Sequence, residues 1–409
     1  GMDRAWLRTS ADAHRAAHVV TPIARFGRVF VESGALAAAA LAGLAAFVNN
    51  ARPATVILTV VAAQLAVASA ATAAMPALHV LRGVLEGLAR GIAYQDGAAW
   101  DRAAQSTAMV FCARGTLLLG EPQVAEIVQL GQATPEHLLS LVAGAELAAS
   151  GPIASAVLRE ARARKLRADS VRSPTVVPGL GVTAITSNGE PCAVGSRVLM
   201  LNQHVPIAAV ENKLAELEAH GRTVLLVAVN SRLVGMVALQ DGLRPGARAS
   251  VQYLLDAGVE PVLLSGDARE TCEAIARSLD IEHVRPEVLP ADRANEIKRI
   301  AESGVIVAVV GRPTVDETAL DAADVAVALD AAGSAMSGWT AKLAGDDVRD
   351  AARALVLART SRGHARVAVM LGAAPGVAAA LSIAFGLLPA PYAPLSMLVG
   401  AVLTYLHAR

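Results

Sequence analysis

Long apolar runs lie near both ends of the chain, and the middle alternates short apolar runs with polar ones. Val29–Val48 is nearly continuous, and a second run goes from Ala54 to about Val80 after the connector NNARP. Val367–Leu388 and Pro391–His407 form another pair, joined near PAP. A spanning helix needs roughly 20 apolar residues, so the pattern predicts two transmembrane hairpins in a lipid bilayer. Four buried helices of a soluble protein are the alternative, disfavoured because two of the runs carry almost no charge.

Arginines flank both predicted hairpins. They are Arg25, Arg28, Arg82 and Arg90 around the first hairpin and Arg362, Arg366 and Arg409 around the second. Cytoplasmic segments next to membrane helices are enriched in Lys and Arg. The pattern therefore predicts that both termini and the long central segment face the cytoplasm, with Arg52 in the first external connector as an exception.

The segment from about Gly97 to Asp350 has the pattern of an α/β domain. Short β-branched runs at 107–112, 261–266, 305–310 and 324–329 predict buried parallel strands. The stretches DARETCEAIARSLD and PADRANEIKRIAES have helical periodicity between them, which predicts a doubly wound sheet. The residues between the first strand and Leu239 differ in character. They are helix-rich from Val124 to Arg167 and strand-like afterwards, which predicts an inserted second domain.

Composition narrows the function classes. The chain has 36 basic and 36 acidic side chains among 409 residues, and no basic run with interleaved aromatics, so a nucleic-acid partner is not expected. Cys112, Cys192 and Cys272 are far apart in the sequence and form no CxxC pair. A zinc ribbon or a dithiol redox motif is therefore not expected, and isolated thiols fit a reducing compartment.

Several stretches resemble the P-type cation-transporting ATPases, most closely the heavy-metal-pump branch. They are the segment from MPALHVLRGVLEG to VFCARGTLLLGEPQV, the segment VALQDGLRPGARASVQYLLDAGVEPVLLSGDARETCEAIARSLDI, and EVLPADRANEIKRI. The opening GMDRAWL is similar to the linker that follows the actuator domain in such pumps. The resemblance implies an α/β protein with membrane helices. Its haloacid-dehalogenase-like, doubly wound phosphorylation domain carries an inserted α+β nucleotide-binding-type domain and is flanked by two transmembrane hairpins.

The resemblance and the hydropathy pattern together predict seven segments. They are a cytoplasmic linker (1–26), transmembrane hairpin 1 (27–80), a connecting helix with the first part of the phosphorylation-type domain (81–120), the nucleotide-binding-type insert (121–239), the second part of the phosphorylation-type domain (240–350), a connecting helix (351–366) and transmembrane hairpin 2 (367–409). The actuator domain and the earlier membrane helices of the family have no counterpart in the sequence. A chain or fused segment that carries them is therefore an expected partner.

The family's phosphorylation loop, DKTGT, is replaced here by Cys112, Ala113, Arg114, Gly115 and Thr116. In the family, the Asp takes the γ-phosphoryl group of ATP. A thiolate is a good nucleophile in other chemistries, but it is not the carboxylate that forms an aspartyl-phosphate, and Mg²⁺ prefers oxygen ligands. A buried Cys at the end of a strand is most often a small core residue. Catalysis by Cys112 is therefore not expected.

Other family motifs also depart from their pattern. The hinge GDGxND becomes GRPTVD, which retains Gly311 and Asp316 but places Arg312 at the first Asp. We predict that the Arg312 side chain pairs with Asp316 or Asp267 and substitutes for Mg²⁺, because two converging carboxylates without a counter-charge repel. In SGDA, Asp267 is retained and Ala268 replaces Asn. Arg293 stands at the position of the family's phosphate-contacting Lys.

The nucleotide and metal positions are also altered. The His of the nucleotide-stacking SEHP motif is Gly151 here, followed by the retained Pro152, while the pocket's Gly-x-Gly pair remains as Gly179 and Gly181. Such a pair also serves any tight turn. The metal-binding CPC triplet corresponds to Val67, Ala68 and Ser69, and a Tyr-Asn pair corresponds to Ala374 and Pro375. These positions lack the thiolate, thioether and imidazole donors that soft metals need.

The resemblance therefore predicts a pseudo-pump that acts as a scaffold, a partner subunit or the regulatory half of a larger protein. Its site is vestigial and consists of Cys112, Gly115, Thr116, Asp267, Arg293, Arg312 and Asp316, with a weak nucleotide pocket at Gly179 and Gly181. Neither ATP nor Mg²⁺, the family's cofactors, is expected to act here, and no bound metal is expected. Two alternatives stay open: an active heavy-metal or other cation pump with divergent motifs, and a membrane-anchored haloacid-dehalogenase-type phosphatase. Both normally need the missing Asp.

Overall fold

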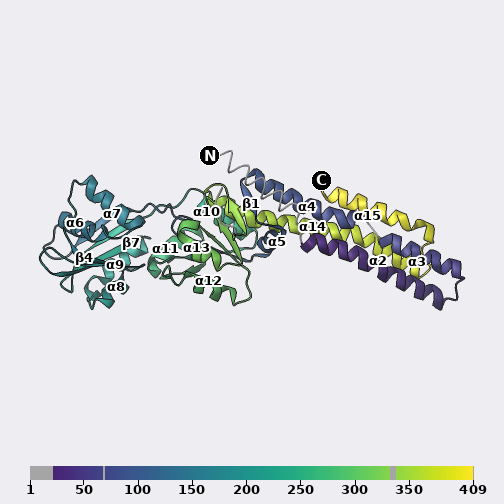
Figure 1. Cartoon of the computed structure of the whole chain (residues 1–409), viewed down its shortest axis with the longest axis horizontal. Helices are drawn as coiled ribbons and strands as arrows, with labels where there is room; N and C mark the ends of the chain where they lie inside the picture. The colour runs from purple at the N-terminus through teal and green to yellow at the C-terminus, as the bar shows by residue number, and fades with distance from the viewer. Residues whose placement is uncertain (1–21, 68–69, 332–337, 409) are drawn as a thin grey trace. The chain divides into compact units, whose positions relative to one another are not determined.

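The computed structural model describes residues 22–67, 70–331 and 338–408. The chain forms two compact units, one made of residues 1–106, 330–346 and 350–409 and the other of residues 107–329 and 347–349. The first contains the long apolar helices and the second contains two β-sheets (Figure 1). The opening segment GMDRAWL, the triplet positions Ala68 and Ser69, and Arg409 lie outside the described residues.

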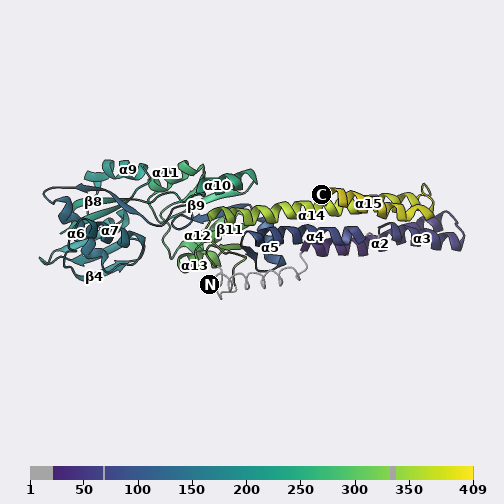
Figure 2. The same ribbon diagram turned by 90° about the horizontal axis from the view of Figure 1, so that it is seen from above.

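Long helices dominate the first unit, and they run side by side in both views (Figures 1 and 2). They are α2 (Pro22–Val48), α3 (Pro53–Val67), α4 (Ala70–Ala89), α14 (Val348–Ala384) and α15 (Ala393–Ala408), with a short 3₁₀ turn, η2 (Ala390–Tyr392), before α15. A small-residue core of Ala42, Ala63, Ala66 and their neighbours joins α2 and α3 to the second hairpin. The unit also holds α5 (Gly97–Gln105) and the antiparallel pair of β1 (Ile92–Tyr94) and β13 (Ala341–Leu343).

The helices agree with the predicted apolar runs. Two of them, Arg25–Val48 and Val348–Ala384, are long and apolar enough to cross a membrane, while Pro53–Val67 is apolar but shorter. The run predicted from Ala54 to Val80 is divided between α3 and α4. Whether α3 with α4, and α15, complete two spanning hairpins stays a prediction.

Five parallel strands of a seven-stranded sheet form the first part of the second unit. Their order is β12-β11-β2-β9-β10, with β2 at Ala108–Cys112, β9 at Glu260–Leu264, β10 at His283–Arg285, β11 at Val307–Gly311 and β12 at Val325–Ala328. Helices α10 (Ala247–Asp256), α11 (Arg269–Leu279), α12 (Arg293–Ala301) and α13 (Pro313–Asp321) connect the strands. Strands β2 and β11 are buried throughout, as expected for a sheet covered on both faces. The four predicted strands and both predicted helices are confirmed.

A six-stranded antiparallel sheet forms the inserted domain, with order β3-β8-β7-β6-β5-β4. Its strands are β3 (Gln123–Gln129), β4 (Arg172–Val177), β5 (Gly181–Ile185), β6 (Pro191–Gly195), β7 (Thr223–Val229) and β8 (Arg232–Gln240). Helices α6 (Pro135–Glu146) and α7 (Pro152–Ala163) pack in one core with the sheet, and α8 (Arg197–Asn202) and α9 (Glu211–Ala219) in another. The 3₁₀ turn η1 (Ala208–Val210) precedes α9. The helix-rich segment predicted from Val124 is wrong at its start, because β3 occupies that stretch.

Candidate functional site

The carboxyl ends of three neighbouring parallel strands bring the altered motif residues together. Cys112 is the last residue of β2 and pairs in register with Leu264 of β9. Asp267 follows β9, and Asp316 lies on α13 directly after β11. Ligand and catalytic sites of open α/β sheets form at this edge. The structure thus brings Asp267 and Asp316 to the ends of neighbouring strands, as the family motifs implied, with Cys112 between them at the end of β2.

The Cys112 thiol is buried, with 2% of the residue exposed, and it lies close enough to the Asp316 carboxyl to feel its charge. Burial, and next the nearby Asp316 carboxyl, raise the pKa of the Cys112 thiol far above its ordinary value, although Arg293 acts in the opposite direction. A thiol in such surroundings stays protonated at neutral pH, and the thiolate is the nucleophilic form. The geometry therefore favours the core-residue reading of Cys112.

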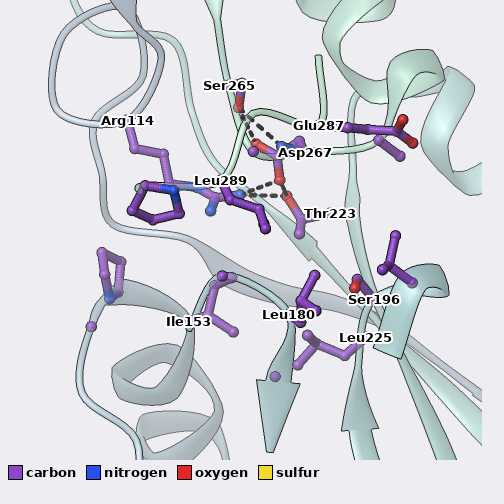
Figure 3. Close-up of a pocket in the computed structure, with 18 of the residues that line it drawn as sticks. Arg114, Ile153, Leu180, Ser196, Thr223, Leu225, Ser265, Asp267, Glu287 and Leu289 are labelled. Atoms are coloured by element: carbon purple, nitrogen blue, oxygen red, sulfur yellow. Dashed lines mark hydrogen bonds and ion pairs between the residues drawn. The ribbon is translucent and has the colours of Figure 1, made fainter. Parts of the chain in front are cut away.

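Arg114 neutralises Asp267. Its Nη2 donates to Asp267 Oδ1 at 2.7 Å and to Thr223 Oγ1 at 2.6 Å, and Thr223 and Ser265 also donate to the same carboxylate (Figure 3). Burial opposes ionisation of Asp267, but the Arg114 charge and these hydrogen bonds outweigh it and hold the pKa of Asp267 below its ordinary value. Asp267 is therefore an ionised carboxylate whose oxygens are already engaged within the protein.

Arg293 neutralises Asp316. Its Nη1 donates to Asp316 Oδ1 at 2.6 Å, and the Asp316 side chain is only 2% exposed. The backbone N–H of Arg312 donates to Asp316 Oδ2 at 3.0 Å. Burial raises the pKa of Asp316, while the Arg312 N–H and the Arg293 charge oppose that rise.

Arg312 also contributes to this site, through its main chain, while the predicted pairing of its side chain stays a prediction. Arg114 and Arg293 supply the guanidinium groups beside the two carboxylates, and Arg312 contributes a main-chain donor. Part of its side chain lies near the turn glycine, because a Cβ on Gly115 would sit 3.4 Å from Arg312 Cδ. Position 312 is the last residue before α13, and its N–H donates to Asp316.

Two further site positions hold the loop in shape. Thr116 is fully buried and its hydroxyl donates to the carbonyl of Cys112. The Asp241 carboxylate accepts the backbone N–H groups of Gly120 and Glu121, at 3.2 and 3.3 Å. Asp241 thereby fixes the chain where it leaves the parallel sheet for the insert. Arg114, Thr223 and Asp241 were not singled out as site residues from the sequence, although Arg114 stands in the altered phosphorylation loop and Asp241 in DGLRP.

A cavity of about 330 Å³ adjoins this cluster and extends into the inserted domain. Its walls include Arg114 and Asp267 on the side of the parallel sheet and Ile153, Leu180 and Leu225 on the side of the insert (Figure 3). Gly151, Gly179 and Gly181 also line it. Asp267 and Arg293, predicted for the phosphate side, and the glycines of the predicted nucleotide pocket therefore border one cavity.

The retained glycine pair has a structural explanation. A Cβ on Gly181 would lie 2.1 Å from the carbonyl oxygen of Val194, on the neighbouring strand β6, and Gly181 has φ +139°. Only glycine fits such a position without strain. Retention of Gly181 is thus required by the pairing of β5 with β6 and says little about a ligand. Gly151, at the position of the family's stacking His, has nothing within 4 Å of its Cβ position, so the cavity lacks a side chain there.

Comparisons with known proteins agree with this architecture. The family of haloacid dehalogenase-like hydrolases matches residues 108–324. The copper-exporting P-type ATPase of Staphylococcus haemolyticus (strain JCSC1435) is 33% identical over 239 residues, covering 58% of this chain and 29% of that protein. The zinc-exporting P-type ATPase of Mycobacterium marinum (strain ATCC BAA-535 / M) is 32% identical over 308 residues, covering 72% of this chain and 42% of that protein. The chain thus spans less than half the length of these curated relatives.

A crystal structure of a zinc-transporting PIB-type ATPase in the E2.Pi state is similar over 100% of this chain and 66% of its own, with a TM-score of 0.62 and 25% identity. Fold and site together define a phosphorylation-type α/β domain with an insert and membrane helices. The chain therefore belongs to the haloacid dehalogenase-like hydrolases and, within them, is a partial member of the heavy-metal P-type ATPases. It is a multi-pass membrane protein whose α/β domains are cytoplasmic.

The residues present do not fit the Mg²⁺ that this family uses. Mg²⁺ demands oxygen ligands in near-octahedral geometry. Here the phospho-acceptor position carries sulfur, and guanidinium groups contact both neighbouring carboxylates. A divalent cation at the same carboxylates would have to displace Arg114 and Arg293.

Proposed function

We propose that this chain is a pseudo-pump, a P-type-ATPase-like membrane module that does not form a phosphoenzyme. The observation that carries the proposal is a buried cysteine, Cys112, at the phospho-acceptor position, beside an Asp316 that is ion-paired with Arg293. In-line phosphoryl transfer needs an acceptor oxygen and a metal ion that neutralises the developing charge. The site has a thiol in place of the acceptor oxygen, and arginines in place of the metal ion.

The same observation weakens both alternatives. An active cation pump and a haloacid-dehalogenase-type phosphatase each pass through an aspartyl-phosphate, and Cys112 cannot form one. A fixed guanidinium stabilises phosphate charge in many enzymes, but Arg114 and Arg293 are already engaged with Asp267 and Asp316. Their positive charge therefore neutralises buried carboxylates within the protein.

The proposed role is that of a scaffold, a partner subunit or a regulatory half. The shape-determining parts of the family are retained, namely the parallel sheet, the insert and the membrane helices, and these can bind another chain without turnover. We propose as partner a chain or fused segment that carries an actuator domain and further membrane helices. The coding sequence on either side of this segment tests that proposal, since the absence of such a segment nearby would count against a fused half.

The decisive experiment is a phosphoenzyme assay on the purified full chain in detergent. The protein is incubated with Mg²⁺ and γ-labelled ATP, quenched in acid, and assayed for protein-bound label with and without hydroxylamine, which cleaves acyl phosphates. We expect no label above a heat-killed control, while an active copper-exporting relative treated in parallel is labelled. Acid-stable label on this chain, whether cleaved by hydroxylamine or not, would contradict the proposal.

A further inference from the structure

Three histidines from three helices meet in the membrane-helix unit. They are His79 on α4, His364 on α14 and His407 on α15. The ring centroids lie 5.9 Å apart for His79–His364, 5.6 Å for His79–His407 and 5.5 Å for His364–His407. Each ring therefore neighbours both others, which makes this a three-membered cluster.

The cluster leaves polar atoms without protein partners. The Nε2 atoms of His79 and His407 are buried and make no hydrogen bond, and only 7% of His79 is exposed. A buried polar atom without a partner costs roughly 1–3 kcal/mol, and such atoms in a native fold call for an explanation such as an ion or a water. Packing alone is satisfied equally well by an apolar side chain at these positions.

Close helix contact brings the histidines together. A Cβ added to Gly83, one turn after His79, would lie 2.1 Å from the Oγ of Ser361, one turn before His364. Helices α4 and α14 therefore approach at this point as closely as glycine permits, and α15 contacts α4 as well. The cluster rests on packing that any side chain at position 83 would disturb.

All three histidines lie at the same boundary of the predicted spans. The apolar runs of the sequence end at Val80, begin at Val367 and end at His407, on the side where arginines mark the cytoplasm. His364 is exposed whereas His79 is buried. The cluster thus has a buried part and an open side at the cytoplasmic edge of the membrane.

We propose that His79, His364 and His407 form a binding site for a transition-metal cation of intermediate softness, with Zn²⁺ as the reference ion. Imidazole nitrogen is a preferred ligand of such ions, and three histidines with a water complete a tetrahedral zinc. With Zn–N bonds of about 2.0–2.1 Å and the ring centre roughly 1.1 Å further on, three imidazoles on one zinc have centroids about 5 Å apart. The observed separations are slightly larger.

Metal binding requires the rings to turn. No group of three or more His, Cys, Asp or Glu side chains among the described residues is already arranged around a metal position. The proposal requires rotation about the side-chain torsions of the three histidines, so that one nitrogen of each ring faces a common point. The site is distinct from the family's thiolate triplet, which corresponds to Val67, Ala68 and Ser69 here, and it does not depend on the proposed loss of phosphorylation.

The test is a metal titration of the full chain in detergent, purified without a polyhistidine tag. Zn²⁺ binding is measured by calorimetry, and Co²⁺ is used as a spectroscopic substitute whose visible absorption reports tetrahedral nitrogen ligation. We expect one ion per chain, and we expect His79→Ala, His364→Ala and His407→Ala each to weaken binding by at least about tenfold. His204→Ala, an exposed histidine in the insert, is the matched control and should bind like the parent.

Thermal unfolding of each variant separates lost binding from lost structure. His79→Ala changes a buried position and His407→Ala a half-buried one, so His364→Ala, at an exposed position, is the deciding variant. Zn²⁺ should also raise the melting temperature of the parent and leave that of His364→Ala unchanged, because a ligand stabilises only the state that binds it. A parent chain that shows no cobalt band, or a triple variant that binds Zn²⁺ as the parent does, would overturn the proposal.

Discussion

Buried charge at the altered phosphorylation site is arranged in pairs, with Arg114 on Asp267 and Arg293 on Asp316. Each carboxylate is almost completely buried, while each arginine keeps a fifth to a quarter of its side chain exposed. When one partner of such a pair is removed, the protein loses much more folding stability than the intact pair contributes, because the other charge is left buried and uncompensated. Stability measurements on arginine variants are therefore the sharpest residue-level test.

Arg293→Ala should lower the free energy of unfolding by roughly 1–3 kcal/mol, because Asp316 loses its guanidinium partner. Arg299→Ala is the control, since Arg299 lies on the same helix α12 but is 71% exposed and pairs with Glu296 one turn away. That variant should change stability by less than about 0.5 kcal/mol. Urea denaturation of the full chain in detergent measures both. Equal stabilities of the two variants would remove the assigned role of Arg293.

Glu146 predicts a pH dependence of stability. Burial raises the pKa of this carboxyl from 4.5 to about 7, so the folded state favours the protonated form. The resulting stabilisation is fully present below the unfolded pKa near 4.5 and is lost as the pH rises through about 7. Glu146→Gln should remove this dependence and make the chain roughly 1–3 kcal/mol more stable than the parent at pH 8. Melting temperatures of parent and variant that run in parallel from pH 5 to pH 8 would contradict this.

Cys112→Asp should destabilise the chain and leave it inactive. A carboxylate at position 112 would lie beside Asp316, which is buried and has one guanidinium to share. Like charges at close range raise the free energy of the folded state unless one takes up a proton, so we expect a loss of roughly 2 kcal/mol or more. Cys112→Ser, which adds no charge, is the control and should lose less. Thermal unfolding and the phosphoenzyme assay measure the two effects, and label on Cys112→Asp would be the contrary result.

Sequence reasoning placed the residues of the site but not their pairing. Cys112, Asp267 and Asp316 could be grouped because each stands at a position of a family motif, at or after the end of a predicted parallel strand. The partner of an arginine cannot be derived in this way, because its side chain is long and several carboxylates lie within reach. The pairing of Arg114 with Asp267 and of Arg293 with Asp316 was therefore not predicted. The backbone N–H of Arg312, which does reach Asp316, depends on the loop conformation.

At the scale of elements, buried strands were predicted more reliably than edge strands. Strands β2, β9, β11 and β12 are apolar and β-branched, so their composition alone identifies them. Strand β3, with sequence QVAEIVQ, lies at the edge of its sheet and is exposed or half-buried along its whole length. Its polar residues resemble those of a surface helix. It pairs with β8, whose residues lie more than 100 positions later in the sequence, and a local pattern cannot predict such a pairing.

Gly83→Leu should disturb the packing of α4 against α14. The Cβ position of Gly83 overlaps the Ser361 hydroxyl, so a larger side chain forces the helices apart, at a cost of roughly 1–3 kcal/mol. Gly363→Leu is the matched control, because Gly363 on α14 has nothing within 4 Å of its Cβ position. Melting temperatures in detergent compare the two variants. A Gly83→Leu chain as stable as Gly363→Leu would show that the helices do not depend on this contact.

At the scale of the whole molecule, the cavity between the parallel strands and the antiparallel sheet of the insert predicts weak nucleotide binding. The cavity keeps its glycine turns, but Gly151 presents no ring to a base. A stacking partner contributes on the order of 1 kcal/mol, or about tenfold in affinity, and Arg114 is engaged with Asp267. The full chain titrated with ATP should show no saturation in the micromolar range by calorimetry. Saturable micromolar binding, competed by ADP, would contradict this.

The fold as a whole could be predicted because hydropathy, strand alternation and family resemblance agree over most of the chain. The histidine cluster could not. His79, His364 and His407 are separated by up to 328 positions in sequence, and no local pattern connects them. Their proximity follows from how α4, α14 and α15 pack, which rests on contacts such as that of Gly83 with Ser361 rather than on any motif.

The pairing of Arg293 with Asp316 also limits what one substitution at this edge of the sheet can restore. An aspartate at position 112 would need a cation beside it, and the nearest guanidinium already neutralises Asp316. The added negative charge would therefore lack a counter-charge unless one carboxyl took up a proton. Under the proposed loss of phosphorylation, a return to the family's chemistry thus needs several substitutions made together, and any single one of them costs stability first.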